Sequence, residues 1–173
     1  MARRIVESPP TGETFIFDDD WNEPDGRVRR IEYVLQPGRT VPAHFHPGTA
    51  QSFAVTSGVL TVTVNGKTTV LGAGDEMVGG PGDIHAQRND GDVPVVSVEG
   101  YDPPIDIEPF FTVLPHAVAS GNPLKMGVFF GDFLPINANV GLPLRIMIAA
   151  MAPLGRLFGF RRWYRDRLPV RQS

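Results

Sequence analysis

Residues 38–58 read GRTVPAHFHPGTAQSFAVTSG, and this stretch contains the strongest functional signal in the chain. In an extended strand successive side chains point to opposite faces, so His44 and His46 project to the same side, roughly 6 to 7 Å apart. The Pro47-Gly48 turn signal then returns the chain, with Gln51 at the head of a new apolar run. Two imidazoles and a carboxamide can therefore reach one cation, and the stretch predicts a metal site.

The composition around this stretch suits one compact domain with many turns. The chain has 173 residues, of which 42% are hydrophobic and 20% are charged, which is enough to bury a core. Nineteen glycines and seventeen prolines without a period favour short strands and an all-β body. Because the chain has no cysteine, disulfides are excluded and any metal must be held by nitrogen and oxygen atoms.

Short apolar runs separated by turn signals extend outward from the histidines. Residues 28–35 alternate in polarity, as a half-buried strand does. Asn65-Gly66 predicts a two-residue type I′ hairpin between residues 59–64 and 67–71, because both turn positions need positive φ. With further turns at glycines downstream, the pattern indicates about eight short strands, the spacing expected of a sandwich or barrel.

The two ends of the chain differ from this middle. Residues 1–26 contain no apolar core of signal-peptide length, so they are interpreted as a lead-in with a short strand at 14–17, and a cytoplasmic protein is expected. Beyond residue 105, prolines forbid one long helix and predict short helices and loops. Pro143 suits the first turn of a helix that Pro153 would break or kink, which predicts a C-terminal helical pair.

Two spaced motifs resemble those of the cupins. The first, Gly-x5-His-x-His-x4-Glu-x6-Gly, fits Gly38, His44, His46 and Gly58, with Gln51 where the family usually has Glu. The second, Gly-x5-Pro-x-Gly-x2-His-x3-Asn, fits Gly74, Gly82, His85 and Asn89, with Gly80 replacing the proline. The fifteen residues between the motifs match the short spacer of small single-domain bacterial cupins of the conserved-barrel type.

The resemblance implies a fold and a domain division. Residues 27–102 would form a double-stranded β-helix, or jelly roll, whose mouth holds a divalent metal. Residues 1–26 would be the lead-in, and residues 103–173 would be a loop and helical extension that packs on the barrel or on a partner subunit. Cupins commonly pair through sheet edges and apolar termini, so a homodimer is expected.

The resemblance also implies the ligands of the metal. Carried over by position, His44, His46, Gln51 and His85 would hold one divalent transition metal, and the sequence does not choose among Fe, Ni, Zn, Mn and Cu. A carboxamide ligand is uncharged, so the ion would keep its full charge and would suit an anionic substrate. Gln51 could instead only form hydrogen bonds in the core, which leaves three histidines as ligands.

Strand parity indicates which other side chains line the pocket. The predicted pocket-lining residues are Tyr33, Phe53, Val55 and Gln87, although core packing explains Phe53 and Val55 equally well. The catalytic residues stay unknown, because no motif marks a general base. Tyr33, Glu32 or Glu99 would serve only if its strand turned it inward.

The function classes that stay open are an enzyme and a binding module. The first is a metal-dependent enzyme on an oxygen-rich small molecule, with lyase, isomerase, cyclase or dioxygenase chemistry. The second is a non-catalytic cupin that binds or senses a small molecule, since fold alone does not imply catalysis.

The charge distribution adds a third candidate function, which is docking through the C-terminal tail. From Arg145 onward there are seven arginines and one acid, so this tail carries +6 and the rest of the chain −9. Such asymmetry suggests attraction to a partner or to an anionic membrane surface, with solvated arginines as the alternative. Nucleic acid is not expected as a partner, because the body is acidic and contains no recognised motif.

Overall fold

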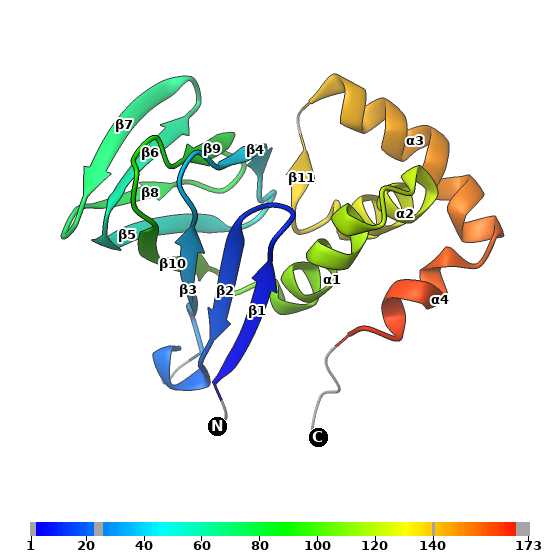
Figure 1. Cartoon of the computed structure of the whole chain (residues 1–173), viewed down its shortest axis with the longest axis horizontal. Helices are drawn as coiled ribbons and strands as arrows, with labels where there is room; N and C mark the ends of the chain where they lie inside the picture. Colours follow the sequence, from blue (N-terminus) through cyan, green and yellow to red (C-terminus); the bar gives the residue numbers. More distant parts are fainter. Residues whose placement is uncertain (1–2, 23–25, 140, 169–173) are drawn as a thin grey trace.

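The computed structural model describes residues 3–22, 26–139 and 141–168, so the remaining parts of the predicted lead-in and tail lie outside it. Its strands form two sheets of a jelly roll, with helices gathered on one side (Figure 1). The six-stranded sheet has the order β1 (Arg4–Ser8), β2 (Glu13–Phe17), β3 (Arg29–Leu35), β10 (Val95–Asp102), β5 (Ala50–Ser57) and β8 (Glu76–Gly79). The five-stranded sheet has the order β11 (Ala138–Asn139), β4 (Thr40–Phe45), β9 (His85–Arg88), β6 (Val59–Val64) and β7 (Lys67–Gly72).

Turn chemistry fixes the strand boundaries where the sequence predicted it. The β6–β7 hairpin turns at Asn65 and Gly66, whose φ values of 47° and 83° confirm the predicted positive-φ turn. Gly58, in the first motif, also has positive φ, and a Cβ there would lie 2.8 Å from the carbonyl oxygen of Pro94. Only glycine fits this close approach between β5 and the start of β10.

The N-terminal segment is more ordered than the predicted lead-in. The expected strand at 14–17 is present as β2, and β1 pairs with it as a further antiparallel strand at the sheet edge. A tertiary ion pair fixes β1, because Arg4 Nε donates to Glu108 Oε1 over 2.6 Å. The local sequence pattern contains little signal for β1, whose residues Ile5 and Glu7 are both exposed. The N-terminal segment then ends in a short 3₁₀ helix, η1 (Asp19–Trp21), which follows β2.

The C-terminal region is mainly helical, so the all-β fold class describes the barrel and not the whole chain. Its helices are α1 (Glu108–Ala119), α2 (Pro123–Phe133), α3 (Leu142–Leu157) and α4 (Phe160–Arg165). Pro143 lies in the first turn of α3 as predicted, and α3 continues through Pro153, so of the predicted break or kink the break does not occur. Proline removes one helical hydrogen bond, and the burial of Ala152 and Gly155 on either side offsets that loss.

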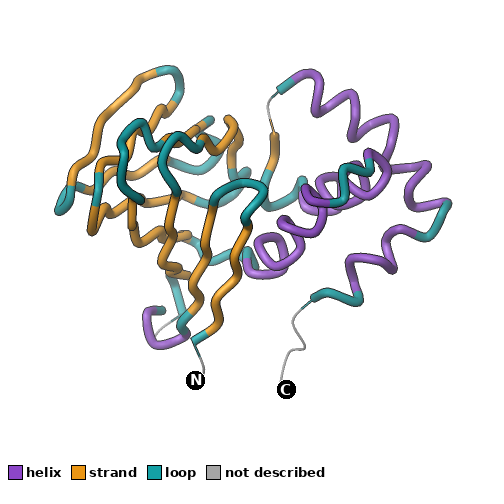
Figure 2. The backbone as a smooth tube through the Cα atoms, in the orientation of Figure 1, coloured by secondary structure: helices purple, strands orange, loops and turns teal. Residues whose placement is uncertain are grey.

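The helices and the barrel share one hydrophobic core. Phe111 of α1 stacks on Phe15 of β2, with ring centroids 3.9 Å apart. The helices also pack closely on one another, because a Cβ at Gly155 would lie 2.4 Å from Val128 Cγ2. Figure 2 shows this helical layer beside the strands. Within the described ranges, none of the helices is long and apolar enough to cross a membrane.

Candidate metal centre

Three buried histidines converge inside the barrel. His44 of β4 lies directly opposite His85 of β9 in the strand register, and His46 follows two residues after His44 on the same side. Their candidate ligand atoms all lie within 4.8 Å of one another. The strand period of two therefore produces the cluster that the His-x-His spacing predicted.

The backbone sets the protonation of each imidazole. His44 Nδ1 lies 2.9 Å from the carbonyl oxygen of Pro42, and His85 Nδ1 lies 2.9 Å from that of Asp83. His46 Nδ1 lies 2.5 Å from the carbonyl oxygen of Ile136, which belongs to the loop after α2. A carbonyl oxygen can only accept, so each Nδ1 carries the proton and each Nε2 keeps a free lone pair.

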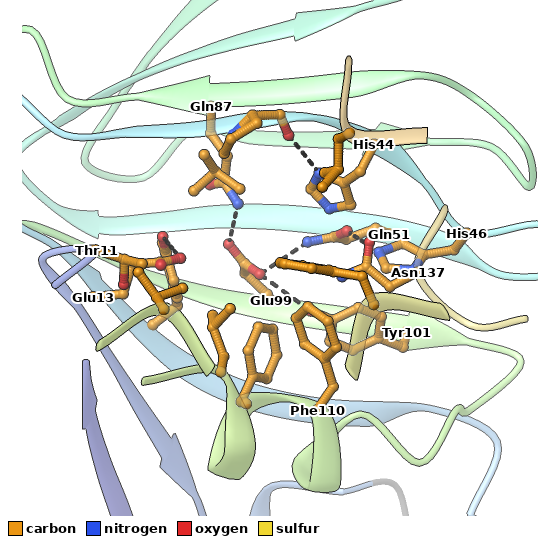
Figure 3. A pocket seen from close by; sticks show the side chains of 18 residues that line it. Thr11, Glu13, His44, His46, Gln51, Gln87, Glu99, Tyr101, Phe110 and Asn137 are labelled. Carbon is orange, nitrogen blue, oxygen red and sulfur yellow. Dashed lines mark hydrogen bonds between the residues drawn. The ribbon is translucent and has the colours of Figure 1, made fainter. Parts of the chain in front are cut away.

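These lone pairs face one another. His44 Nε2 lies 3.2 Å from His85 Nε2, and His46 Nε2 lies 2.8 Å from Gln51 Oε1. Gln51 is held in this orientation because its Nε2 donates to Glu99 Oε2 over 2.8 Å (Figure 3). Acceptor atoms at these separations repel unless a cation lies among them. The four side chains therefore fit a divalent transition metal bound by imidazole nitrogen and amide oxygen.

Burial keeps the imidazoles neutral. Burial, with a smaller contribution from neighbouring imidazoles, lowers the pKa of His44 to about 3 and that of His85 to about 4. Burial also lowers the pKa of His46. Neutral imidazole is the form that binds a metal, so protons do not compete for this site near neutral pH.

The depressed pKa of His85 predicts how acid affects the metal-free protein. The unfolded chain takes up a proton on this residue near its ordinary pKa of 6.5, whereas the folded chain does so only near 4. The neutral His85 imidazole therefore contributes its full share to the free energy of unfolding above pH 6.5. This contribution is lost as the pH falls toward 4, at about 1.4 kcal/mol per pH unit. Denaturant unfolding with chelator across this range should give a shallower acid slope for His85→Gln. Equal slopes in the two proteins would show that this imidazole is not held neutral.

A buried carboxyl lies beside the histidines. Glu99 of β10 accepts hydrogen bonds from Gln51 Nε2, from Gln87 Nε2 over 3.0 Å and from the Tyr101 hydroxyl over 3.3 Å. Burial raises the pKa of Glu99 to about 7, although the hydrogen bond from Gln87 opposes the rise. Its role in this arrangement is to position Gln51, whose oxygen it turns toward His46.

Strand parity decides which of the possible bases turn inward. Glu99 and Tyr33 are buried, and Glu99 lies opposite the buried residues Ile31 and Phe53 in the register. Glu32 points outward and pairs with Arg3, with 3.2 Å between Oε1 and Nη2. Glu99 was detectable from the sequence, because Val95, Ser97 and Glu99 share one face of β10.

Glu99→Gln is expected to lower metal affinity roughly 10- to 100-fold, the usual effect of removing a partner that orients a ligand. The carboxylate accepts from the Gln51 and Gln87 amides through two oxygens, whereas the new amide has a single acceptor oxygen and an NH2 group. Gln51 would therefore lose its fixed orientation. Competition with a chelator measures the affinity. Glu32→Gln makes the same chemical change on the outer face and should leave affinity unchanged. Equal affinities in the two variants would contradict the positioning role.

A cavity of about 170 Å³ adjoins the histidines (Figure 3). His44, His46 and Gln51 line it, as do the predicted residues Tyr33 and Gln87. One side of its wall comes from the helical region, through Phe110, Phe111, Leu114, Val118, Phe130 and Leu144. The C-terminal helices therefore form one side of the site.

The other predicted residues lie beside this cavity. His85 contacts His44 but is not one of the residues that line the cavity. Phe53 and Val55 are buried in the barrel core and do not line the cavity among the described residues, so the core-packing interpretation describes them. The ring of Phe53 lies 5.7 Å from that of His85.

Sequence reasoning missed several lining residues. Glu13 accepts a hydrogen bond from the Tyr33 hydroxyl over 2.8 Å, and its inward parity with Phe15 on β2 was a usable signal. Tyr101 had the same kind of signal, because it shares the inward face of β10 with Glu99. Asn137 had none, because it reaches the site only through the return of the chain as β11.

Comparison with known proteins supports the motif assignment. The cupin domain family model matches residues 31–100. An oxidoreductase of Arthrobotrys oligospora is 36% identical over 89 residues, which cover 47% of this chain and 34% of the relative. Gentisate 1,2 dioxygenase 1 of Aquipseudomonas alcaligenes is 32% identical over 72 residues, which cover 42% of this chain and 21% of the relative. The chain thus spans about a third and a fifth of these two relatives' lengths.

A solved structure supports the fold. KdgF from Halomonas sp. superposes with a TM-score of 0.51 at 18% sequence identity, covering 61% of this chain and 89% of that chain. The segment that the family model matches contains both motifs and all four predicted ligands. Residues 31–100 are therefore a cupin domain.

Proposed function

We propose that this protein holds one divalent transition metal through His44, His46, His85 and Gln51 and acts as a small-molecule dioxygenase. The observation that carries the proposal is the convergence of four unprotonated acceptor atoms beside a cavity. All four ligands are uncharged, so the bound ion keeps its full charge and favours an anionic, oxygen-bearing substrate.

The cavity supports a compact substrate with an apolar body. Its volume of about 170 Å³ compares with the roughly 150 Å³ of a cavity that holds benzene, so one ring fits. Phenylalanine and aliphatic side chains of α1 and α2 form one side of the wall, and that side offers no hydrogen bonds to a polyhydroxylated sugar. The expected substrate is therefore a small hydroxylated aromatic acid or a short β-diketone.

Gln87 supplies a specific polar contact. Its side chain is 3% exposed and lines the cavity, and its Nε2 is already bonded to Glu99. Its Oε1 has no hydrogen-bond partner within the described part of the chain. An unpaired buried acceptor is costly, so a substrate hydroxyl that donates to this atom would be selected.

The chemistry follows from these groups. A bound iron ion would supply Lewis acidity and reactivity with O2, and the helical wall would exclude water from the reaction. Ring cleavage by a dioxygenase places both atoms of O2 in the product, so no separate reductant is needed. The similarity of 72 residues to a gentisate dioxygenase supports this reaction class.

Oxygen uptake tests the proposal. The metal-stripped protein is reconstituted with Fe(II) and supplied in turn with hydroxylated aromatic acids, β-diketones and sugar acids. Uptake is expected with a member of the first two classes, and it should vanish in His44→Ala while persisting in His116→Ala, whose imidazole is exposed. Tight metal binding without uptake in any class would overturn the dioxygenase assignment.

A second candidate is a binding module that holds its ligand unchanged. It is favoured by the engagement of the lining carboxyls, since Glu99 accepts three hydrogen bonds and Glu13 accepts one from Tyr33. These hydrogen bonds give both carboxyls a positioning role that requires no chemistry. Recovery of the bound small molecule without alteration would support this function.

A further inference from the structure

The outward face of α3 is apolar and uncovered. The inner face of this helix packs on α2 through the buried residues Ile148, Ala152 and Gly155. The large side chains left exposed on α3 and at its end are Leu142, Ile146, Leu154, Leu157 and Phe158, here called the α3 outer face. Leu157 is 80% exposed and Phe158 is 67% exposed, which is unusual for side chains of this size.

Helical spacing makes this face continuous. Leu142 and Ile146 are four residues apart, and the exposed residues Ala149, Ala150 and Pro153 connect them to Leu157. No polar side chain interrupts this stripe. An apolar stripe facing away from the core indicates a surface that is covered when the protein functions.

Positive charge borders the α3 outer face. Arg145 and Arg156 lie beside the stripe, and α3 itself contains no acidic residue. Arg156 pairs with Asp132 of α2, with 2.7 Å between Nη2 and Oδ1, so that carboxylate neutralises part of its charge. Helix α4, which follows directly, adds three arginines in the sequence FRRWYR, of which Arg161 also pairs with Asp132. Apolar side chains bordered by arginines match the interface of an anionic bilayer, where the apolar groups insert and the guanidinium groups meet phosphates.

We propose that the α3 outer face binds the surface of an anionic lipid bilayer. Charge favours this occupant over a second copy of the chain. Pairing the face with itself would bring Arg145 and Arg156 of both copies together, and the neighbouring carboxylate of Asp132 on α2 is already paired with Arg156. The opposite side of the same helix carries Leu144, which lines the cavity, so binding would bring the apolar wall of the site close to the bilayer.

Co-flotation of the metal-loaded full chain with vesicles tests the proposal. Binding is expected to vesicles of phosphatidylcholine mixed with phosphatidylserine, and to be weaker with phosphatidylcholine alone and at high salt. Ile146→Glu with Leu157→Glu should weaken binding at least about tenfold for each side chain. Arg145→Gln should weaken it roughly fivefold.

A matched control makes the same chemical change on the barrel. Val70 and Val78 are 62% and 60% exposed, so Val70→Glu with Val78→Glu should leave vesicle binding unchanged. Metal content and circular dichroism confirm that each variant folds. If Ile146→Glu with Leu157→Glu does not fold, the single change Leu157→Glu replaces it.

Three results would overturn the proposal. The first is failure of the parent protein to float with either type of vesicle. The second is equal loss of binding in the α3 and barrel variants. The third is a dimer, measured by light scattering, that becomes a monomer in Ile146→Glu with Leu157→Glu, together with no binding of the parent protein to lipid. This result would assign the face to a second copy of the chain.

Discussion

The His44→Ala variant is expected to lose its metal, with affinity falling more than about a hundredfold, since removal of an outer-shell partner alone costs 10- to 100-fold. His44 Nε2 faces His85 Nε2 at 3.2 Å, so its removal takes away one of the central donors of the site. Elemental analysis of protein purified without chelator measures occupancy, and competition with a chelator measures affinity.

His116→Ala provides the control for this change. It removes the one histidine outside the cluster, and that side chain is exposed on α1. It should therefore retain the metal content of the parent protein. If His44→Ala retained as much metal as His116→Ala, the ligand set would be wrong.

Phe111→Ala is expected to lower the free energy of unfolding by about 3–5 kcal/mol, the usual cost of removing a buried aromatic ring. Phe111 is 9% exposed, stacks on Phe15 and also lines the cavity. The change would leave a void between the barrel and α1, where neither layer can close without moving against the other. Denaturant unfolding in the presence of chelator separates this effect from metal binding.

Phe158→Ala is the matched control, because that ring is exposed at the end of α3 and its loss should change stability by less than about 0.5 kcal/mol. The two layers are also expected to unfold in a single transition, since they share one core. If the helices of Phe111→Ala melted separately while the barrel kept its full stability, the helical region would be an independent unit.

The tertiary structure explains why residue 51 is glutamine. Its Oε1 faces His46 while its Nε2 donates to Glu99, and only an amide can accept at one end and donate at the other. A glutamate at this position would place two carboxylates in contact, and such a pair retains a proton. The sequence alone indicated only that the ligand set is uncharged.

Local patterns determined the barrel and the histidine cluster. The two-residue period of strands places His44 and His46 on one face, and the Asn65-Gly66 turn forms the β6–β7 hairpin. The spacing of the two motifs then placed Gln51 and His85 within reach of the same point. Each of these signals lies within a short segment, so it can be detected without knowledge of the fold.

Contacts between distant segments decided the remainder of the site. The carbonyl oxygen of Ile136, 90 residues after His46, fixes the protonation of that imidazole. The side chains of α1 and α2 close the cavity, although the sequence indicated only an appended helical region. Such contacts depend on how the helical layer packs against the barrel through pairs such as Phe15 and Phe111. No local period encodes that packing, because it is set by the shapes of two surfaces that meet only in the folded chain.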